Sequence, residues 1–169
     1  MTTRVSFSKL TLMDALDLAS LIEVEACKRY ELFAAQIGHR APDDAASMFR
    51  SMAINEKKHG DQIAERRKAL FGDAPARVKL DDVFDVEAPD VGAVTWDMSA
   101  LKALKVALSS EQKAYDFYDE ALPGVTQPDV KALFLELRDE EAEHIQMVKA
   151  IIDKLPPEAA IDLHDADVD

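Results

Sequence analysis

Residues 134–148 read FLELRDEEAEHIQMV. Alternating steps of three and four residues connect Phe134, Leu137, Glu141, His144 and Val148, a spacing that places all five on one face of a helix. This face is apolar at both ends and carries a glutamate and a histidine at its centre. Because an isolated buried carboxylate is costly, the pattern predicts that Glu141 meets partners from other parts of the chain.

Three further segments show the same pattern. In each, the apolar face of a predicted helix, called the seam below, is interrupted by a glutamate. Helical periodicity predicts helices over residues 11–38, 42–71, 97–122 and 127–155, and no segment shows the alternation of a β-strand. The seams of the first three are interrupted by Glu23, by Glu56 with His59, and by Glu111. The sequence therefore predicts an all-α protein.

The connections between these helices predict their arrangement. About 24 residues, 72–95, separate the second and third helices, and a connection this long is uncommon in compact domains. In a four-helix bundle it can cross the length of the bundle, so that helices 2 and 3 run parallel. Residues 1–155 are predicted to form this bundle, and 156–169, with five acidic residues and no Lys or Arg, a flexible acidic tail.

The four seam glutamates lie at a common depth. Each is 12 to 14 residues from the predicted start of its helix, or roughly 18–21 Å at 1.5 Å per residue. Residues in the middle of their helices share one layer whether the neighbouring helices run up or down. The four carboxylates and the two imidazoles are therefore expected to converge.

A pair of divalent cations is the simplest way to stabilise this layer. Four glutamates carry four negative charges, which two divalent ions neutralise. Glu and His at positions i and i+3 share a helix face and can reach one metal, and mixed carboxylate and imidazole ligation suits iron, or manganese as the alternative. The sequence thus predicts a dinuclear site with the ligands Glu23, Glu56, His59, Glu111, Glu141 and His144.

The site residues form an internal repeat. Glu23 and Tyr30 are seven residues apart, as are Glu111 and Tyr118, and the Glu-x-x-His run at 56–59 recurs at 141–144. Two helical hairpins related by a pseudo-two-fold axis would each provide half of the site. Tyr30 and Tyr118 are expected to hydrogen-bond ligand carboxylates and orient them, a role compatible with packing as core aromatics.

These residues resemble those of the ferritin-like di-iron superfamily. The resemblance covers about 11–155 and is strongest to rubrerythrin-like proteins that lack a rubredoxin domain, on Glu23 with Tyr30, Glu111 with Tyr118, the segment 29–34 (RYELFA) and the two runs 55–59 (NEKKH) and 140–144 (EEAEH). It implies a ferritin-like four-helix bundle holding two iron ions. It also implies oxidation of Fe(II) with peroxide or O2, and a homodimer.

Two departures from rubrerythrins bear on function. The single cysteine, Cys27, cannot build the four-cysteine iron domain, so the electron donor must be a separate protein. Ala114 stands where rubrerythrins carry an extra glutamate that exchanges with a histidine, which leaves a ligand set closer to a bacterioferritin ferroxidase centre. An iron-binding or ferroxidase protein without a peroxidase cycle is the alternative function, and oxidation of an organic substrate is a third.

Composition excludes other classes of partner. Lys and Arg number 20 against 33 Asp and Glu, a net charge of -13 that disfavours nucleic acid and anionic membranes. There is no apolar run of about 18 residues and no signal peptide at the start of the sequence, so a cytoplasmic location is expected.

Four other glutamates fall off the seams. Glu25 is the main alternative to Glu23 as a metal ligand. Glu23 is favoured because it lies seven residues before Tyr30, the spacing that Glu111 and Tyr118 repeat. The others are expected to lie on a solvated face: Glu31, Glu140 and Glu143. Cys27 is expected to be a small core residue rather than a redox thiol.

Overall fold

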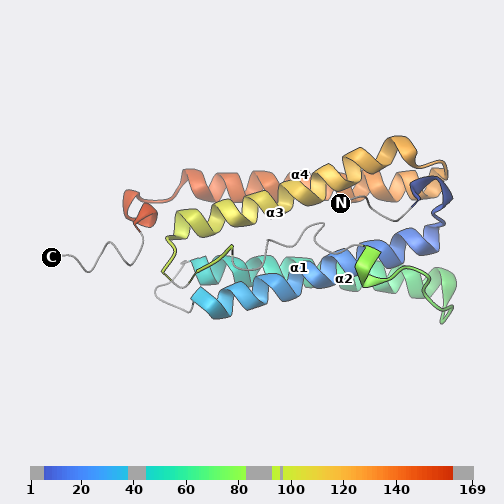
Figure 1. Cartoon of the computed structure of the whole chain (residues 1–169), viewed down its shortest axis with the longest axis horizontal. Coiled ribbons are helices and arrows are strands. Elements are labelled where there is room, and N and C mark those ends of the chain that lie inside the picture. Colours follow the sequence, from blue (N-terminus) through green and yellow to red (C-terminus); the bar gives the residue numbers. More distant parts are fainter. Residues whose placement is uncertain (1–5, 38–44, 83–92, 96, 162–169) are drawn as a thin grey trace.

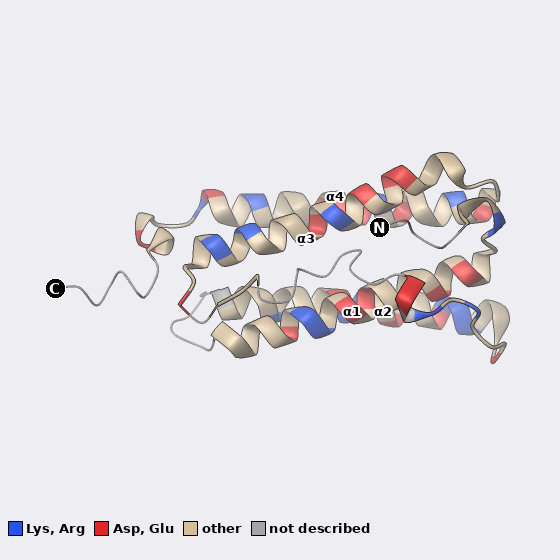
Figure 2. Cartoon of the chain, in the orientation of Figure 1, with Lys and Arg blue, Asp and Glu red and all other residues tan. Residues whose placement is uncertain are grey.

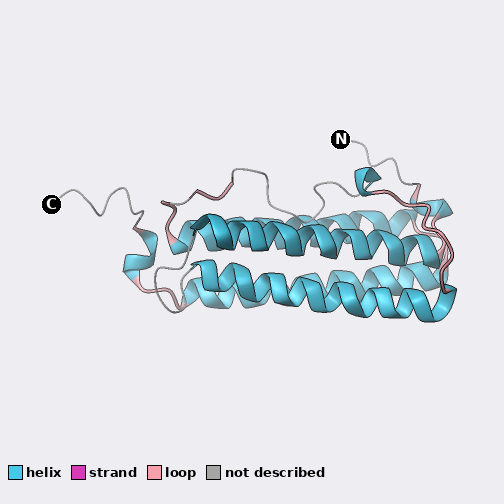
Figure 3. Ribbon diagram, turned by 90° about the horizontal axis from the view of Figure 1, so that it is seen from below, coloured by secondary structure: helices cyan, strands magenta, loops and turns pink. Residues whose placement is uncertain are grey.

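The regular structure of the chain is entirely helical in the residues that the computed structural model describes, 6–37, 45–82, 93–95 and 97–161. Four long helices run along the long axis of the molecule (Figures 1 and 3). They are α1 (Leu12–Ile37), α2 (Ala45–Phe71), α3 (Ala100–Ala121) and α4 (Pro128–Asp153). Helices α1 and α2 pack as one hairpin and α3 and α4 as a second. The prediction of an all-α four-helix bundle is confirmed.

The hydrophobic core has two parts, one on each side of the middle of the bundle. The first core contains Leu16 and Ile22 of α1, Ile63 of α2, and residues near the end of α3 and the start of α4. The second contains residues from Ala26 onward in α1, the first part of α2, the first part of α3, and Val148 of α4. Helices α2 and α3 therefore both run from the second core to the first, and are parallel. The predicted long crossover between them is confirmed (Figure 1).

The start of α1 is capped by the side chains of Thr11 and Asp14. The backbone N–H of Thr11 donates to Oδ2 of Asp14 at 3.1 Å, and the backbone N–H of Asp14 donates to Oγ1 of Thr11 at 3.2 Å. This reciprocal arrangement satisfies N–H groups that a helix start leaves without partners. Helix α2 ends before Gly72, whose positive φ of 57° favours glycine and stops the helix.

Two predicted helix starts shift by a few residues. Helix α3 begins at Ala100 rather than 97, because Ser99 is its N-cap and accepts from the backbone N–H of Lys102 at 3.2 Å. Helix α4 begins at Pro128 rather than 127. Just before it, the hydroxyl of Thr126 donates to the carbonyl oxygen of Ser8 at 2.9 Å. The predicted boundaries at 38 and 42 lie outside the described residues.

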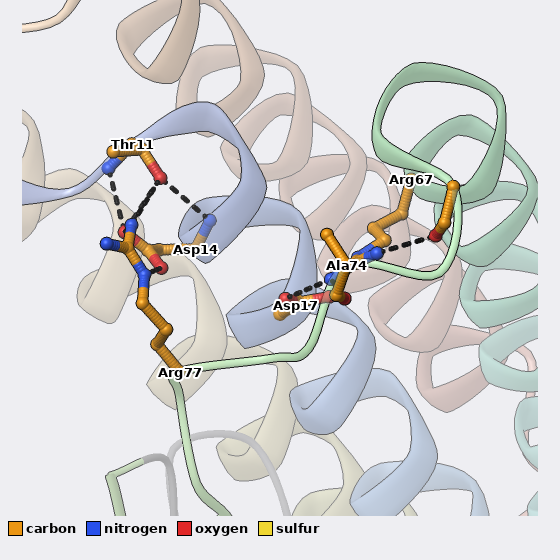
Figure 4. Close-up of polar contacts among 7 residues, drawn as sticks. Thr11, Asp14, Asp17, Arg67, Ala74 and Arg77 are labelled. Atoms are coloured by element: carbon orange, nitrogen blue, oxygen red, sulfur yellow. Dashed lines mark hydrogen bonds and ion pairs between the residues drawn. The ribbon is translucent and has the colours of Figure 1, made fainter.

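Two arginines attach the beginning of the crossover to α1 (Figure 4). Arg67 donates to both carboxylate oxygens of Asp17, at 2.8 and 3.2 Å, and to the carbonyl oxygens of Gly72 and Ala74. Arg77 likewise donates to both carboxylate oxygens of Asp14, to Oδ1 at 3.0 Å and to Oδ2 at 2.7 Å. Bidentate pairing fixes orientation as well as charge, so these contacts define where the chain leaves α2.

Charged residues are spread over all four helices (Figure 2). In the part of the chain that the structure describes, no helix combines the length and apolarity that crossing a bilayer requires. After α4, the described part of the predicted tail contains a 3-10 turn at Pro157–Ala160. Residues 162–169 of that tail lie outside the described residues.

Candidate metal centre

The four seam glutamates lie in one buried layer between the two parts of the core. Glu23, Glu56 and Glu111 each follow the first residue of their helix by 11 positions, and Glu141 follows by 13. Each is at most 1% exposed. Apolar side chains of the two parts of the core lie on either side of this layer, so the carboxylates interact mainly with other groups of the protein.

His144 is at the centre of the layer. Its Nδ1 donates to Oε2 of Glu111 at 3.0 Å, and lies 3.6 Å from Oε2 of Glu141 and 3.8 Å from Oε1 of Glu56. Carboxylates from α2, α3 and α4 therefore lie within 4 Å of one imidazole nitrogen. This is the convergence that the common depth of the glutamates predicts.

The second histidine lies parallel to the first. The rings of His59 and His144 are stacked with their centroids 5.1 Å apart and 3° between their planes. His59 is half-buried, and its Nδ1 has no hydrogen-bond partner in the part of the chain that the structure describes. The two Glu-x-x-His runs, on α2 and α4, thus face each other as the internal repeat predicts.

Several buried polar atoms of the layer lack partners. Among the described residues, Oε2 of Glu23, of Glu56 and of Glu141 each have no hydrogen-bond partner, and neither does Nδ1 of His59. Buried polar atoms are normally hydrogen-bonded, so four such acceptors close together require an explanation. Oxygen and imidazole nitrogen atoms with free lone pairs are the donor set that suits iron or manganese.

Burial changes the protonation of the glutamates. It raises the pKa of Glu23 to about 8, with the Glu141 carboxylate adding to the effect and a hydrogen bond to Glu56 opposing it. Burial also raises the pKa of Glu56 and of Glu141 well above the usual range, and neighbouring carboxylates add to it. Without a metal, the layer therefore holds protons at neutral pH.

The two histidines shift in opposite directions. Burial lowers the pKa of His144, but its hydrogen bond to Glu111 and the neighbouring carboxylates of Glu141 and Glu56 outweigh burial and raise the pKa to about 11. Burial and the charge of His144 lower the pKa of His59. In the metal-free protein, His144 acts as a cation that offsets part of the carboxylate charge, while His59 stays neutral.

Two groups of potential ligand atoms share His144. One consists of Glu56, His59 and His144 and the other of Glu111, Glu141 and His144, with the ligand atoms of each group within 4.8 Å of one another. Glu23 belongs to neither group and reaches the layer through its hydrogen bond to Glu56. The structure thus brings all six predicted ligands together, with Glu23 at the edge.

The two predicted tyrosines are both fully buried but have different surroundings. The Tyr30 hydroxyl donates to Oε1 of Glu111 at 2.6 Å, and its ring stacks on Phe49. Tyr118 packs edge-to-face against Phe117 and Phe134. Tyr30 therefore contacts a carboxylate of the other hairpin rather than Glu23 on its own helix.

The off-seam glutamates lie outside the layer. Glu25 forms an ion pair with Lys28 at 3.1 Å, and the structure leaves Glu31 and Glu143 exposed. Glu140 differs from the expected solvated position: it is half-buried, and burial together with the Glu136 carboxylate raises its pKa. Its place one residue before Glu141 brings it close to the layer without joining either ligand group.

Sequence reasoning missed one residue that contacts the site. Gly60 follows His59 and is buried against Glu23, so that a Cβ atom at Gly60 would lie 3.3 Å from Cβ of Glu23. A glycine in the interior of a long helix is unfavourable, so the glycine at position 60 is the feature of the sequence that could have identified this residue.

Comparison with known proteins agrees with this architecture. A protein-family model described as a ferritin-like domain matches residues 16–157. An uncharacterized conserved protein from Magnetospirillum magnetotacticum MS-1 has a similar structure, with 30% identity and a TM-score of 0.71 over 87% of this chain and 97% of that one. A bacterioferritin from Rhodobacter capsulatus, solved with a metal-free dinuclear site, has 21% identity and a TM-score of 0.59 over 87% of this chain and 88% of that one. A search of curated protein sequences gives no significant match.

Proposed function

Since the chain belongs to the ferritin-like domain family, we propose that its buried carboxylate layer binds two iron ions and supports oxidation of Fe(II) by peroxide or O2. The observation that carries this proposal is the set of buried acceptor atoms without partners: three carboxylate oxygens and one imidazole nitrogen in a single layer. The residues that would hold the metals are Glu23, Glu56, His59, Glu111, Glu141 and His144.

Charge balance supports two metals rather than one. The layer contains four carboxyl groups, each at most 1% exposed, and an uncompensated charge at such a depth is strongly unfavourable. Two divalent ions neutralise four carboxylates, whereas one leaves two negative charges. In the metal-free protein, protons on Glu23, Glu56 and Glu141 and on His144 supply this compensation, and metal binding would release them.

When bound, two Fe(II) ions supply the two electrons that reduce peroxide to water. Each residue of the layer has a distinct part. Glu56 and Glu141 lie between the two hairpins and belong to different ligand groups. Tyr30 orients Glu111 through its hydroxyl, which limits the positions that this ligand can adopt.

Peroxide reduction of the rubrerythrin type is the first form of this activity. It needs an external electron donor, because Cys27 is the only cysteine of the chain. We propose that a separate protein supplies the electrons, and that the chain acts as a cytoplasmic homodimer.

One observation favours a second form, a ferroxidase that handles iron. Ala114 is fully buried in α3, one helical turn after Glu111. It offers no carboxylate that could replace a histidine when the metals change oxidation state. The fixed set of four Glu and two His suits repeated binding and oxidation of Fe(II), with iron itself as the substrate.

Stopped-flow absorbance after anaerobic Fe(II) loading tests the proposal and separates its two forms. Fast formation of ferric absorbance with peroxide and slow formation with O2 favours the peroxidase. Fast oxidation by O2 followed by release of ferric iron favours the ferroxidase. Oxidation no faster than that of free Fe(II) in buffer contradicts both.

A further inference from the structure

Gly60 of α2 lies directly against the Glu23 position of α1. It is buried, and a Cβ atom added to it would lie 3.3 Å from Cβ of Glu23. Carbon atoms in favourable contact are about 3.5–4.0 Å apart. The neighbour that a larger residue would meet is the first atom of the Glu23 side chain, so a change of rotamer cannot remove the conflict.

The equivalent position in the other hairpin is occupied by a large residue. The offset of 85 residues that relates His59 to His144 also relates Gly60 to Ile145, which is buried. In agreement, α1 and α2 pack against each other more extensively than α3 and α4 do. The two halves of the layer are therefore built differently, and the glycine is in the half that contains Glu23.

We propose that Gly60 is a positioning residue of the metal centre, which rests on the proposed function. By allowing α1 to approach α2, it places the Glu23 carboxylate against Glu56. Glu23 lies outside both groups of clustered ligand atoms. Of the six ligands it can therefore move away the least before its carboxylate no longer reaches a metal. Metal–ligand distances hold within about 0.2 Å, and a Cβ atom at Gly60 would move Glu23 by a comparable amount or more.

A purely structural glycine would give the opposite result. Alanine is more favourable than glycine in a helix interior, so Gly60→Ala would stabilise the protein and leave metal binding unchanged if the close approach had no role. The proposal predicts weaker metal binding whatever happens to the stability of the metal-free protein.

Co(II) is a suitable probe, because its visible absorbance reports binding without redox chemistry. Titration in the presence of a competing chelator gives the affinity of the unmodified chain and of Gly60→Ala. We expect an affinity loss of about tenfold to a hundredfold, the range found when a residue that supports a ligand is changed. The control is Ala64→Gly, at an exposed position of the same helix, which should leave Co(II) affinity unchanged.

A double-mutant cycle tests whether Gly60 acts through Glu23. In Glu23→Ala the Cβ atom remains but the carboxylate is gone, so adding Gly60→Ala should cause little further loss of affinity. If the losses of Co(II) affinity caused by the two single substitutions multiply in the double variant, the proposal is contradicted. Unchanged Co(II) affinity in Gly60→Ala would contradict it as well. If Gly60→Ala does not fold, Glu23→Gly should restore folding by removing the Cβ atom that it meets, and failure to do so overturns the assignment. Absence of Co(II) binding by the unmodified chain would instead refute the proposed function.

Discussion

The Tyr30 hydroxyl in α1 donates a 2.6 Å hydrogen bond to Oε1 of Glu111 in α3. This bond joins the two helical hairpins inside the carboxylate layer, where both residues are fully buried. The other carboxylate oxygen of Glu111 accepts from His144. Glu111 is thus held from two sides, by one residue of each hairpin.

Replacing Tyr30 with phenylalanine should weaken this connection. The ring can keep its stacking on Phe49, but a buried acceptor of Glu111 loses its donor, which costs about 1–3 kcal/mol. We expect the free energy of unfolding of the metal-free protein to fall by that amount in urea denaturation. Tyr115→Phe, at a half-buried position of α3, is the control, and equal losses in the two variants would contradict this role for Tyr30.

The metal-free protein should lose stability as the pH rises from 6.5 to 8. The native pKa of His144 is raised to about 11, and that of Glu23 to about 8. Both groups therefore hold protons in the native state that the unfolded chain has released, and stability falls as pH increases. The slope approaches about 1.4 kcal/mol per pH unit for each such group.

Urea denaturation with a metal chelator at pH 6.5 and 8 measures this dependence. His59 has a lowered pKa and acts in the opposite direction, but its effect fades as the pH rises above the unfolded value of 6.5, so its contribution is small in this range. Bound metal should reverse the trend, because it replaces the protons of the layer. A metal-free protein that becomes more stable between pH 6.5 and 8 is incompatible with these protonation states.

The contacts of Arg67 should protect the start of the crossover from proteolysis. Arg67→Lys keeps the charge but cannot donate to Asp17 and to the carbonyl oxygens of Gly72 and Ala74 at once. We expect faster cleavage within residues 72–79 in limited proteolysis, with metal content unchanged. Arg66→Lys is a matched control, since Arg66 pairs only with the exposed Glu136 in the described contacts. Equal cleavage of the two variants would show that the contacts of Arg67 do not protect this segment.

Much of the fold and of the site is predictable from helical periodicity. Residues in the middle of antiparallel or parallel helices share a layer, so Glu23, Glu56, Glu111 and Glu141 could be brought together without knowing which helices are neighbours. The crossover follows from the length of the connection at 72–95, because a short loop would have forced α2 and α3 to be antiparallel.

Contacts between helices could not be predicted in the same way. The spacing of Glu23 and Tyr30 does not reveal that Tyr30 reaches Glu111 of the other hairpin, because that depends on the rotation and separation of the helices. Gly60 is a further example, since its effect comes from a distance between two backbones. The half-burial of Glu140 likewise depends on how neighbouring helices cover its side of α4.

Anaerobic equilibrium dialysis against Fe(II) measures whether the buried layer binds two metals in each chain. We predict two irons per chain for the unmodified protein and for Glu25→Ala, whose carboxylate pairs with Lys28 at the periphery. Glu56→Ala should bind fewer than the unmodified protein, because Glu56 belongs to the ligand group with His59. Equal iron content in Glu56→Ala and the unmodified protein, or no stoichiometric iron in either, would contradict the account.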